Sequence, residues 1–269
     1  MTVSPFPLPH TPRWPSPLAR AGLWIIAAGV LLSAVSGPLN RFGVTDLQTA
    51  LAVLAAGFLL TAIGTAIAII GLLAAIAKRC PIPSSATLVG IVVGLALTGY
   101  LLSWVRRGLT TPPIHDITTD PADPPAFVAV IGLRARANAI NAPEYVRQMR
   151  GPGGRMIDVP RLQQKYYPDV RPLQLALPPA QALNKALRVA REFQWRIDAE
   201  SPAEGRLEAT AETTFFGFKD DVVVRIRPSG TGSRIDVTSE SRVGLGDVGT
   251  NAARIRAFLK RMAQRHGSS

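Results

Sequence analysis

A period of two runs through the segment Leu207-Glu-Ala-Thr-Ala-Glu-Thr-Thr-Phe215, where small or apolar side chains alternate with polar ones. Successive side chains of a strand point to opposite faces of the sheet, so this alternation predicts a strand with one buried face. The same period occurs at 193–200, 222–227 and 235–239, and short segments separate the four. We therefore expect an antiparallel sheet of four or more strands.

Helical periodicity flanks this sheet on both sides in the sequence. Apolar residues recur at i, i+4 and i+7 in Pro179–Glu192, and the same spacing runs from 248 to 262, with Asp247 as the expected N-cap. Helices that precede and follow a run of strands indicate an α+β fold in which the helices pack on the sheet.

Two segments before this regular part are rich in proline or glycine. The first runs from Thr111 to Phe127, and its prolines exclude a helix, so we expect an ordered strap or a linker. The second, Arg150-Gly-Pro-Gly-Gly-Arg155, predicts a loop.

The first 109 residues have the composition of a membrane protein. They contain seven Lys or Arg and one acid, Asp46, whereas residues 110–269 contain 23 Lys or Arg and 17 acids. Apolar stretches at 18–36, 49–77 and 86–105 each reach the roughly 20 residues that cross ~30 Å of hydrocarbon. A purely soluble protein is therefore excluded.

The chain thus divides into three parts. We expect a disordered Pro-rich tail at 1–17, a region of three transmembrane helices at 18–109 and a separately folded α+β domain at 110–269. With a cytoplasmic N-terminus, four Lys or Arg flank the spans inside and three outside, which favours an outward-facing domain by the positive-inside rule. Cleavage of the first stretch as a signal peptide is the alternative and leaves the domain on the same side.

Glycines recur in the second and third spans, at Gly57, Gly64 and Gly71 and again at Gly90 and Gly94. Small residues let helix backbones approach closely in lipid. Packing among the three helices of one chain is the expected use of these faces, and a homo-oligomer is the alternative. The spans have no ionisable residue in their middle, which argues against an ion or proton pathway and indicates an anchor surrounded by membrane lipid.

Several functional classes are excluded or disfavoured. The single cysteine, Cys80, excludes an internal disulfide, and three histidines are too few for a Cys/His zinc site, so we expect no metal and no cofactor. The sequence has no HExxH, Walker loop, GxSxG or dinucleotide fingerprint, so enzymatic activity is not indicated. The acids of the domain are interspersed with its arginines, which disfavours nucleic-acid binding.

Adjacent carboxylates at Asp220 and Asp221 begin the third predicted strand. Two carboxylates facing one cavity attract a cation or raise one another's pKa, but neighbours in a strand point to opposite faces. The expected role is that of solvated turn residues, and the alternative is pairing of one of them with an arginine.

Asp247, Asn251 and Arg254 are spaced four and three apart, on one face of the first turns of the final helix. Arg242 leaves the preceding strand through a glycine loop and could fold back onto that face. The functional interpretation is an anion or headgroup site at a helix N-terminus, and the structural one is an Asp–Arg network that fixes the turn.

His115 and Asp116 are adjacent in the strap, and a carboxylate can orient a catalytic imidazole. Adjacent residues in an extended segment seldom do so. A membrane-anchored hydrolase that uses His115 with Asp116 or Asp220 is therefore the alternative from the enzyme class.

Three motifs together resemble a family of bacterial and plastid proteins catalogued as domain of unknown function 1499. They are the strap from Ile114 to Phe127, the segment Phe216-Gly-Phe-Lys-Asp-Asp-Val222, and the run Ser241-Arg-Val-Gly with Asp247 and Asn251-Ala-Ala-Arg-Ile255. The likeness covers roughly residues 112–265. The positions that match are His115, Asp116, Asp220, Asp221, Arg242, Asp247, Asn251 and Arg254.

The resemblance implies no activity, because that family has no established reaction. Its plastid members are associated with the thylakoid lumen, which implies an extracytoplasmic domain. We therefore expect a non-enzymatic, multi-pass protein of the bacterial inner membrane whose periplasmic domain binds an envelope lipid or a protein partner, with a structural membrane scaffold as a further alternative. The ligand-binding residues expected are the eight that match the motifs.

Overall fold

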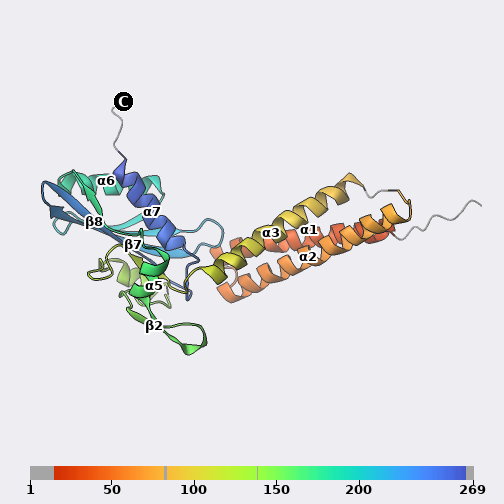
Figure 1. Ribbon diagram of the computed structural model, residues 1–269, viewed down its shortest axis with the longest axis horizontal. Helices are drawn as coiled ribbons and strands as arrows, with labels where there is room; N and C mark the ends of the chain where they lie inside the picture. Colours follow the sequence, from red (N-terminus) through yellow and green to blue (C-terminus); the bar gives the residue numbers. More distant parts are fainter. Residues whose placement is uncertain (1–14, 82–83, 138, 265–269) are drawn as a thin grey trace, which may run out of the picture. The chain divides into compact units, whose positions relative to one another are not determined.

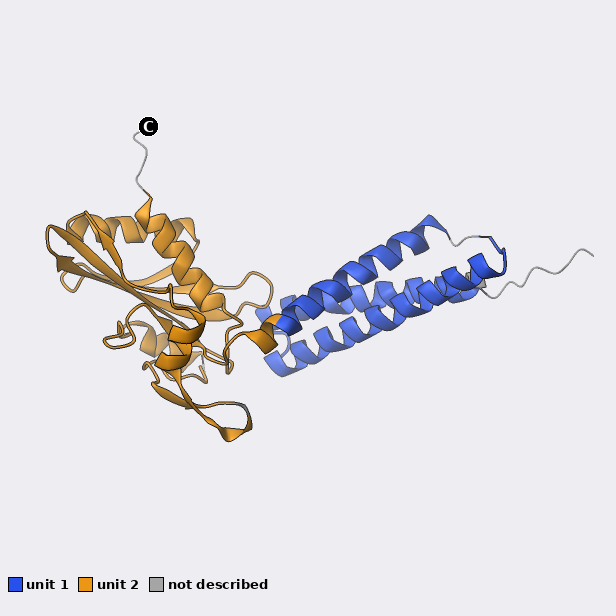
Figure 2. Cartoon of the chain, viewed as in Figure 1, with its two compact units in different colours: residues 1–106 blue, residues 107–269 orange. Residues whose placement is uncertain are grey.

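The computed structural model describes residues 15–81, 84–137 and 139–264. The chain forms two compact units, Met1–Arg106 and Arg107–Ser269 (Figure 2). The expected disordered tail lies outside the described residues up to position 14, and the first helix already begins at Pro15.

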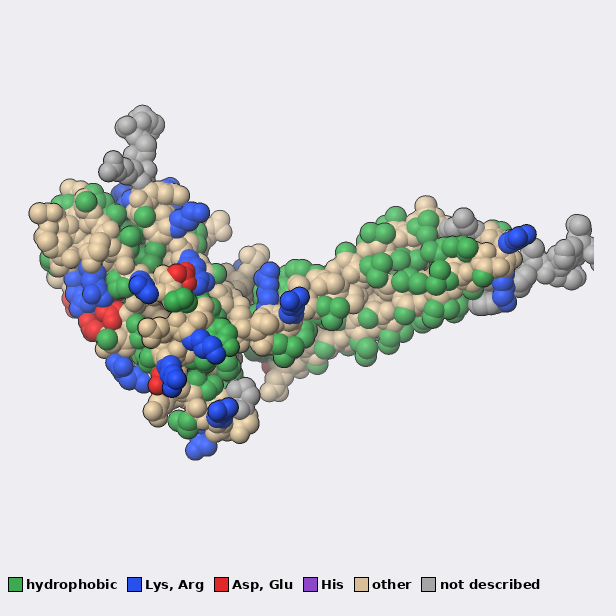
Figure 3. Space-filling view, in the orientation of Figure 1, with side chains coloured by type: hydrophobic (Ala, Val, Ile, Leu, Met, Phe, Trp, Pro, Cys, Tyr) green, Lys and Arg blue, Asp and Glu red, His purple; other side chains and the backbone are tan. Residues whose placement is uncertain are grey.

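The first unit consists of three helices, α1 (Pro15–Arg41), α2 (Leu47–Ala77) and α3 (Ser85–Thr110). All three are long and apolar enough to cross a membrane, by length and composition. Hydrophobic side chains cover much of their visible surface (Figure 3). The prediction of three long apolar helices is confirmed, and each helix extends beyond the apolar stretch that predicted it.

The glycines of α2 face α1. A Cβ added to Gly64 would lie 2.7 Å from the backbone nitrogen of Ile26, and one added to Gly22 would lie 2.5 Å from that of Ala68. Real side chains cannot approach so closely, so only glycine permits this helix contact. The repeat at 57, 64 and 71 is therefore used for packing within the chain.

Glycines of α3 also contact the other two helices of the unit. A Cβ on Gly90 would lie 2.5 Å from a side-chain carbon of Leu23, and Gly94 lies against the hydroxyl of Thr65 in the same way. The small-residue face of the third span thus packs against α1 and α2.

The second unit is an α+β domain built on an antiparallel sheet of six strands (Figure 1). The predicted meander is confirmed, and two short strands, β1 and β4, pair side by side with the outer edge of β8. The strands are β1 (Asp116–Thr118), β4 (Leu173–Leu175), β5 (Arg196–Ser201), β6 (Arg206–Glu212), β7 (Lys219–Ser229) and β8 (Gly232–Ser241).

One face of this sheet carries the hydrophobic core. Helices α6 (Pro179–Glu192) and α7 (Thr250–Ala263) pack on it, and their buried residues form one cluster with those of the strands (Figure 1). Figure 1 shows both helices on the same side of the sheet. The opposite face is polar and is covered in part by α4 (Val130–Arg136), which packs through Val130 on Val223.

The strap is ordered against the sheet rather than free. Its strand β1 pairs with β8, and the side chain of Gln163 in α5 (Val159–Tyr166) covers its outer edge. The Gln163 amide donates to the carbonyl of Thr118 at 2.7 Å and accepts from its N–H at 3.1 Å. This side chain satisfies the backbone groups that a further strand would otherwise pair.

The segment predicted as a loop at 150–155 is the tip of a small hairpin. Strands β2 (Gln148–Arg150) and β3 (Met156–Asp158) pair with each other, and a single 3-10 turn, η1 (Pro152–Gly154), joins them. Gly153 and Gly154 have φ of +71° and +76°, a conformation that glycine adopts without strain.

Candidate functional site

A row of buried polar side chains crosses the polar face of the sheet. Asp116 pairs with Glu240, Glu240 with Asp221, and Asp221 with Thr210 in the register of four neighbouring strands. Directly paired residues lie on the same face, so their side chains are neighbours. All four are at most 4% exposed.

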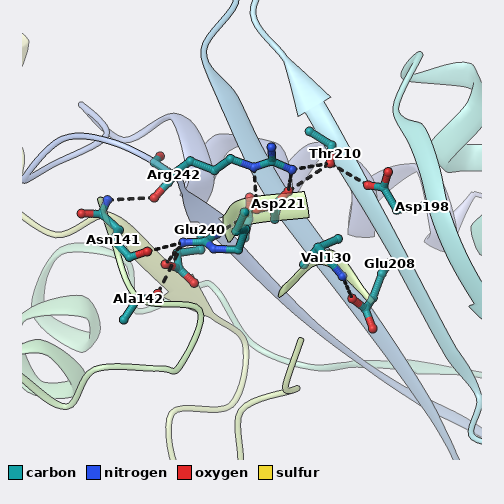
Figure 4. Close-up of polar contacts among 12 residues, drawn as sticks. Val130, Asn141, Ala142, Asp198, Glu208, Thr210, Asp221, Glu240 and Arg242 are labelled. Atoms are coloured by element: carbon teal, nitrogen blue, oxygen red, sulfur yellow. Dashed lines mark hydrogen bonds and ion pairs between the residues drawn. The ribbon is translucent and has the colours of Figure 1, made fainter. Parts of the chain in front are cut away.

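Two arginines neutralise part of this row (Figure 4). Arg134 of α4 donates to Asp221 at 2.8 Å and to Glu240 at 2.7 Å. Arg242 binds both oxygens of Asp221, at 2.9 Å through Nε and 2.7 Å through Nη2. Charge-assisted bonds of this kind are among the strongest that proteins form.

Several atoms at the Asp116 end of the row have no partner. Among the described residues, none bonds to either oxygen of Asp116, to Oε2 of Glu240 or to the hydroxyl of Tyr145. Burial raises the pKa of the Asp116 and Glu240 carboxyls well above their ordinary values, and the charge of Arg134 opposes the rise. Buried polar groups normally find partners, so this end of the row is unusual.

A second polar cluster lies on the opposite face, beside α7. Arg254 pairs with Asp220 and donates to the hydroxyl of Ser239 at 2.9 Å and to the amide oxygen of Asn251. Asn251 is fully buried and also donates to the backbone carbonyl of His115 at 2.9 Å. This cluster fixes α7 to strands β7 and β8.

Asp247 serves the start of α7 without being its N-cap. The N-cap is Gly249, with φ of +81°, and the Asp247 carboxylate accepts from the N–H groups of Gly249 and Asn251 at 2.9 and 2.6 Å. Burial raises the pKa of this carboxyl, while these two backbone bonds oppose the rise. The prediction of a cap at Asp247 is wrong by two residues, although the carboxylate still satisfies the helix N–H groups.

The structure separates residues that the sequence grouped. Asp220 and Asp221 point to opposite faces, as expected, but both are buried and paired with arginines, so the prediction of solvated turn residues is wrong. Arg242 does not fold onto α7, because its N–H still donates to Lys219 and keeps the chain extended beside β7. The side chain of Arg242 therefore lies on the Asp221 face. The ligand-binding role predicted for these residues stays a prediction.

His115 and Asp116 do not bond to each other, since neither oxygen of Asp116 has a partner among the described residues. His115 is 8% exposed, and burial lowers its pKa. The carboxylate of Asp220 pairs with Arg254 rather than with His115. The structure therefore does not assemble the catalytic pair of the hydrolase alternative.

A cavity of about 510 Å³ lies between the strap and α5. Arg161 and Arg171 on its rim are exposed, and Tyr167 forms part of its wall. Its residues are Thr119, Asp120, Pro121, Ala122, Asp158, Pro160, Arg161, Gln163, Gln164, Tyr167, Pro168, Val170 and Arg171.

The acidic side chains of this cavity already have partners within the domain, whereas one of its arginines makes no ion pair with a described residue. Asp120 pairs with Arg234 at 2.6 Å, and Asp158 accepts from the backbone N–H of Arg161 at 3.0 Å. The Arg161 guanidinium, in contrast, makes no ion pair within the described part of the chain. The Arg161 guanidinium can therefore bind an anion that enters the cavity.

Sequence reasoning missed the residues that organise both regions. Arg134, Gln163 and Glu208 are buried and join elements 45 to 106 residues apart. Glu208 accepts from three N–H groups at the start of α4, at 128, 129 and 130. Glu208 falls on the polar face of the predicted strand, so the alternation gave no signal that this acid is buried.

Within the described ranges, no group of three or more His, Cys, Asp or Glu is arranged to hold a metal ion. No curated protein matches the chain. The family described as protein of unknown function (DUF1499) matches residues 116–262, more than half of the chain and almost the whole second unit. The chain therefore belongs to the DUF1499 family.

Proposed function

We propose that this protein is a binding module anchored in the bacterial inner membrane, and that its periplasmic domain holds an anionic group, such as the phosphate of a lipid headgroup, in the cavity beside α5. The proposal rests on the charged side chains at the rim of that cavity. Arg161 and Arg171 are exposed there, and the nearby acids Asp120 and Asp158 already have partners. A guanidinium matches phosphate and carboxylate geometry, and a volume of about 510 Å³ is within the usual range for ligand sites.

The residues matching the family motifs support a different role. Arg242, Asp247, Asn251 and Arg254 direct their hydrogen bonds to groups of the domain itself. We assign them to holding the sheet, the strap and α7 together. Binding rather than hydrolysis is proposed because neither His115 nor Asp116 belongs to the lining of the cavity beside α5.

The proposed outward orientation rests on the count of Lys and Arg beside the spans, which is four on the membrane side that holds the N-terminus and three on the other side. The glycine faces of the spans are occupied within the chain. Self-association through them is therefore not part of the proposal.

Calorimetric titration of the full-length protein in detergent with glycerol 3-phosphate tests the binding site, and inorganic phosphate separates headgroup from free-ion binding. Replacing both Arg161→Gln and Arg171→Gln should weaken binding at least tenfold, about 1.4 kcal/mol. The melting temperature should change by less than about 2 °C, because exposed substitutions cost little stability.

The matched control replaces two exposed arginines of the hairpin, Arg150→Gln and Arg155→Gln, and should bind like the wild type. Equal affinity of both double variants for glycerol 3-phosphate, or no binding by the wild type, would contradict the proposal.

A further inference from the structure

The polar row contains more acid groups than its arginines can neutralise. Asp116, Glu240 and Asp221 lie side by side on three strands, and only Arg134 and Arg242 lie within ion-pair distance of them in the described part of the domain. With every group ionised, the cluster carries one net negative charge. Burying an uncompensated charge is costly, so the cluster favours uptake of one positive charge.

The other groups facing this cluster do not supply that charge. His115 has a pKa lowered by burial, so it is neutral at neutral pH. Asp198 reaches the row through the hydroxyl of Thr210 and is itself paired with Arg196 at 2.8 Å. From the described segment above the strap, Tyr145 presents a hydroxyl and Val146 an N–H, both uncharged, while the guanidinium of Arg147 donates to the backbone carbonyl of Ala122 at 3.0 Å.

The unpartnered oxygens show where the missing charge belongs. Both oxygens of Asp116 and Oε2 of Glu240 lack a donor among the described residues, whereas Oε1 of Glu240 accepts from Arg134. Asp116 and Glu240 are directly opposite in the β1–β8 register, which places their Cβ atoms roughly 4.5–5.5 Å apart. Two carboxyl groups at that spacing can share a proton, one as the donor and the other as the acceptor.

We propose that Asp116 and Glu240 together bind one proton, and that this proton holds the strap strand β1 against β8. The proton comes from solvent and forms an O–H···O bond between a carboxylic acid and a carboxylate. It leaves the five-residue charge cluster neutral and gives a partner to oxygens that otherwise have none.

Loss of this proton weakens the pairing of β1 with β8, and β1 is a short strand. Strand β1 has only three residues, and it follows directly after the segment that continues from α3. Two ionised carboxylates directly opposite each other repel across the strand pair. Deprotonation therefore favours release of β1 from β8. The order of the strap, which follows α3 in the chain, then depends on pH.

The direction of the pH dependence follows from the raised pKa of both carboxyls in the folded state. The folded protein keeps a proton that the unfolded chain loses near pH ~4, so this stabilisation is complete in acid and is lost as pH rises through the raised values. Asp169 shows the opposite behaviour, because its bond to Arg256 lowers its pKa and it is ionised throughout this range.

Infrared spectroscopy of the full-length protein in detergent tests the shared proton through the C=O stretch of protonated carboxylic acid. The wild type should show this band at neutral pH and lose it in a titration from about pH 5 to about pH 10. Asp116→Asn and Glu240→Gln should each abolish it, because one remaining acid is neutralised by the arginines. The exposed control Asp169→Asn should leave the band unchanged.

Hydrogen exchange measured by mass spectrometry tests the consequence. After correction for intrinsic rates, protection of the peptide covering 112–119 should fall several-fold above neutral pH in the wild type and stay constant in Asp116→Asn. The amide that replaces the Asp116 carboxylate can still donate to Oε2 of Glu240, which has no other donor among the described residues, so this variant should fold, and Glu240→Gln gives an independent check. Absence of the band at neutral pH, its persistence in both variants, or equal pH dependence of strap protection in wild type and variant overturns the proposal.

Discussion

Asp221 is the residue on which most of the buried charge of the domain converges. It is fully buried and accepts hydrogen bonds from Arg134, Arg242 and the hydroxyl of Thr210. The sequence predicts that Asp221 and Asp220 point to opposite faces, because strand alternation is local. Their burial could not be predicted, since Arg134 and Arg254 reach them from 87 and 34 residues away.

Removing this carboxylate should strongly destabilise the domain. In Asp221→Ala two buried arginines lose their shared acceptor, and breaking a buried pair in this way costs about 3–5 kcal/mol. Thermal unfolding of the full-length protein measures the loss. The control Asp169→Ala removes an exposed partner of Arg256 and should cost about 0–1 kcal/mol. Equal shifts in melting temperature for the two variants would show that the Asp221 cluster is not structural.

At the level of elements, the helices and strands with a long periodic pattern were predicted correctly, whereas the shortest strands were not predicted. The meander and α6 follow from alternation and from the i, i+4, i+7 spacing over many residues, and the structure confirms them. Strands β1 and β4 have three residues each, too short for a period, and only their pairing with β8 orders them. The side chain of Gln163, which closes the edge of β1, is likewise visible only in three dimensions.

Gln163→Ala should destabilise the strap, because it leaves the buried N–H and C=O of Thr118 without partners. Each unsatisfied backbone group costs about 1–3 kcal/mol. Because the strap is then less stable, the rate of amide hydrogen exchange in the strap should rise at a fixed pH. The neighbouring Gln164→Ala is exposed and serves as the control, and it should leave both exchange and melting temperature unchanged. A strap as well protected in Gln163→Ala as in the wild type would refute the edge-closing role.

At the scale of the whole molecule, composition alone separated an apolar N-terminal region from a charged one, and the structure has three membrane-capable helices followed by an α+β domain. The candidate ligand site was the part that sequence could not locate. The cavity is lined by 119–122, which belong to the strap motif, and by residues of 158–171, which lie outside the three motifs, whereas the charged residues at the other two family motifs form internal networks. The charged motif residues therefore stabilise the fold, whereas the cavity forms where two segments that are distant in the sequence come together.

The most direct test of a membrane-anchored binding module is native mass spectrometry of the full-length protein released gently from membranes. We expect a discrete added mass on the wild type, with the composition of an anionic lipid or headgroup. The double variant Arg161→Gln with Arg171→Gln should carry that mass in a much smaller fraction of molecules. A wild type without bound anion, or the same mass retained fully by the double variant, would contradict the assignment of the cavity beside α5 as the binding site.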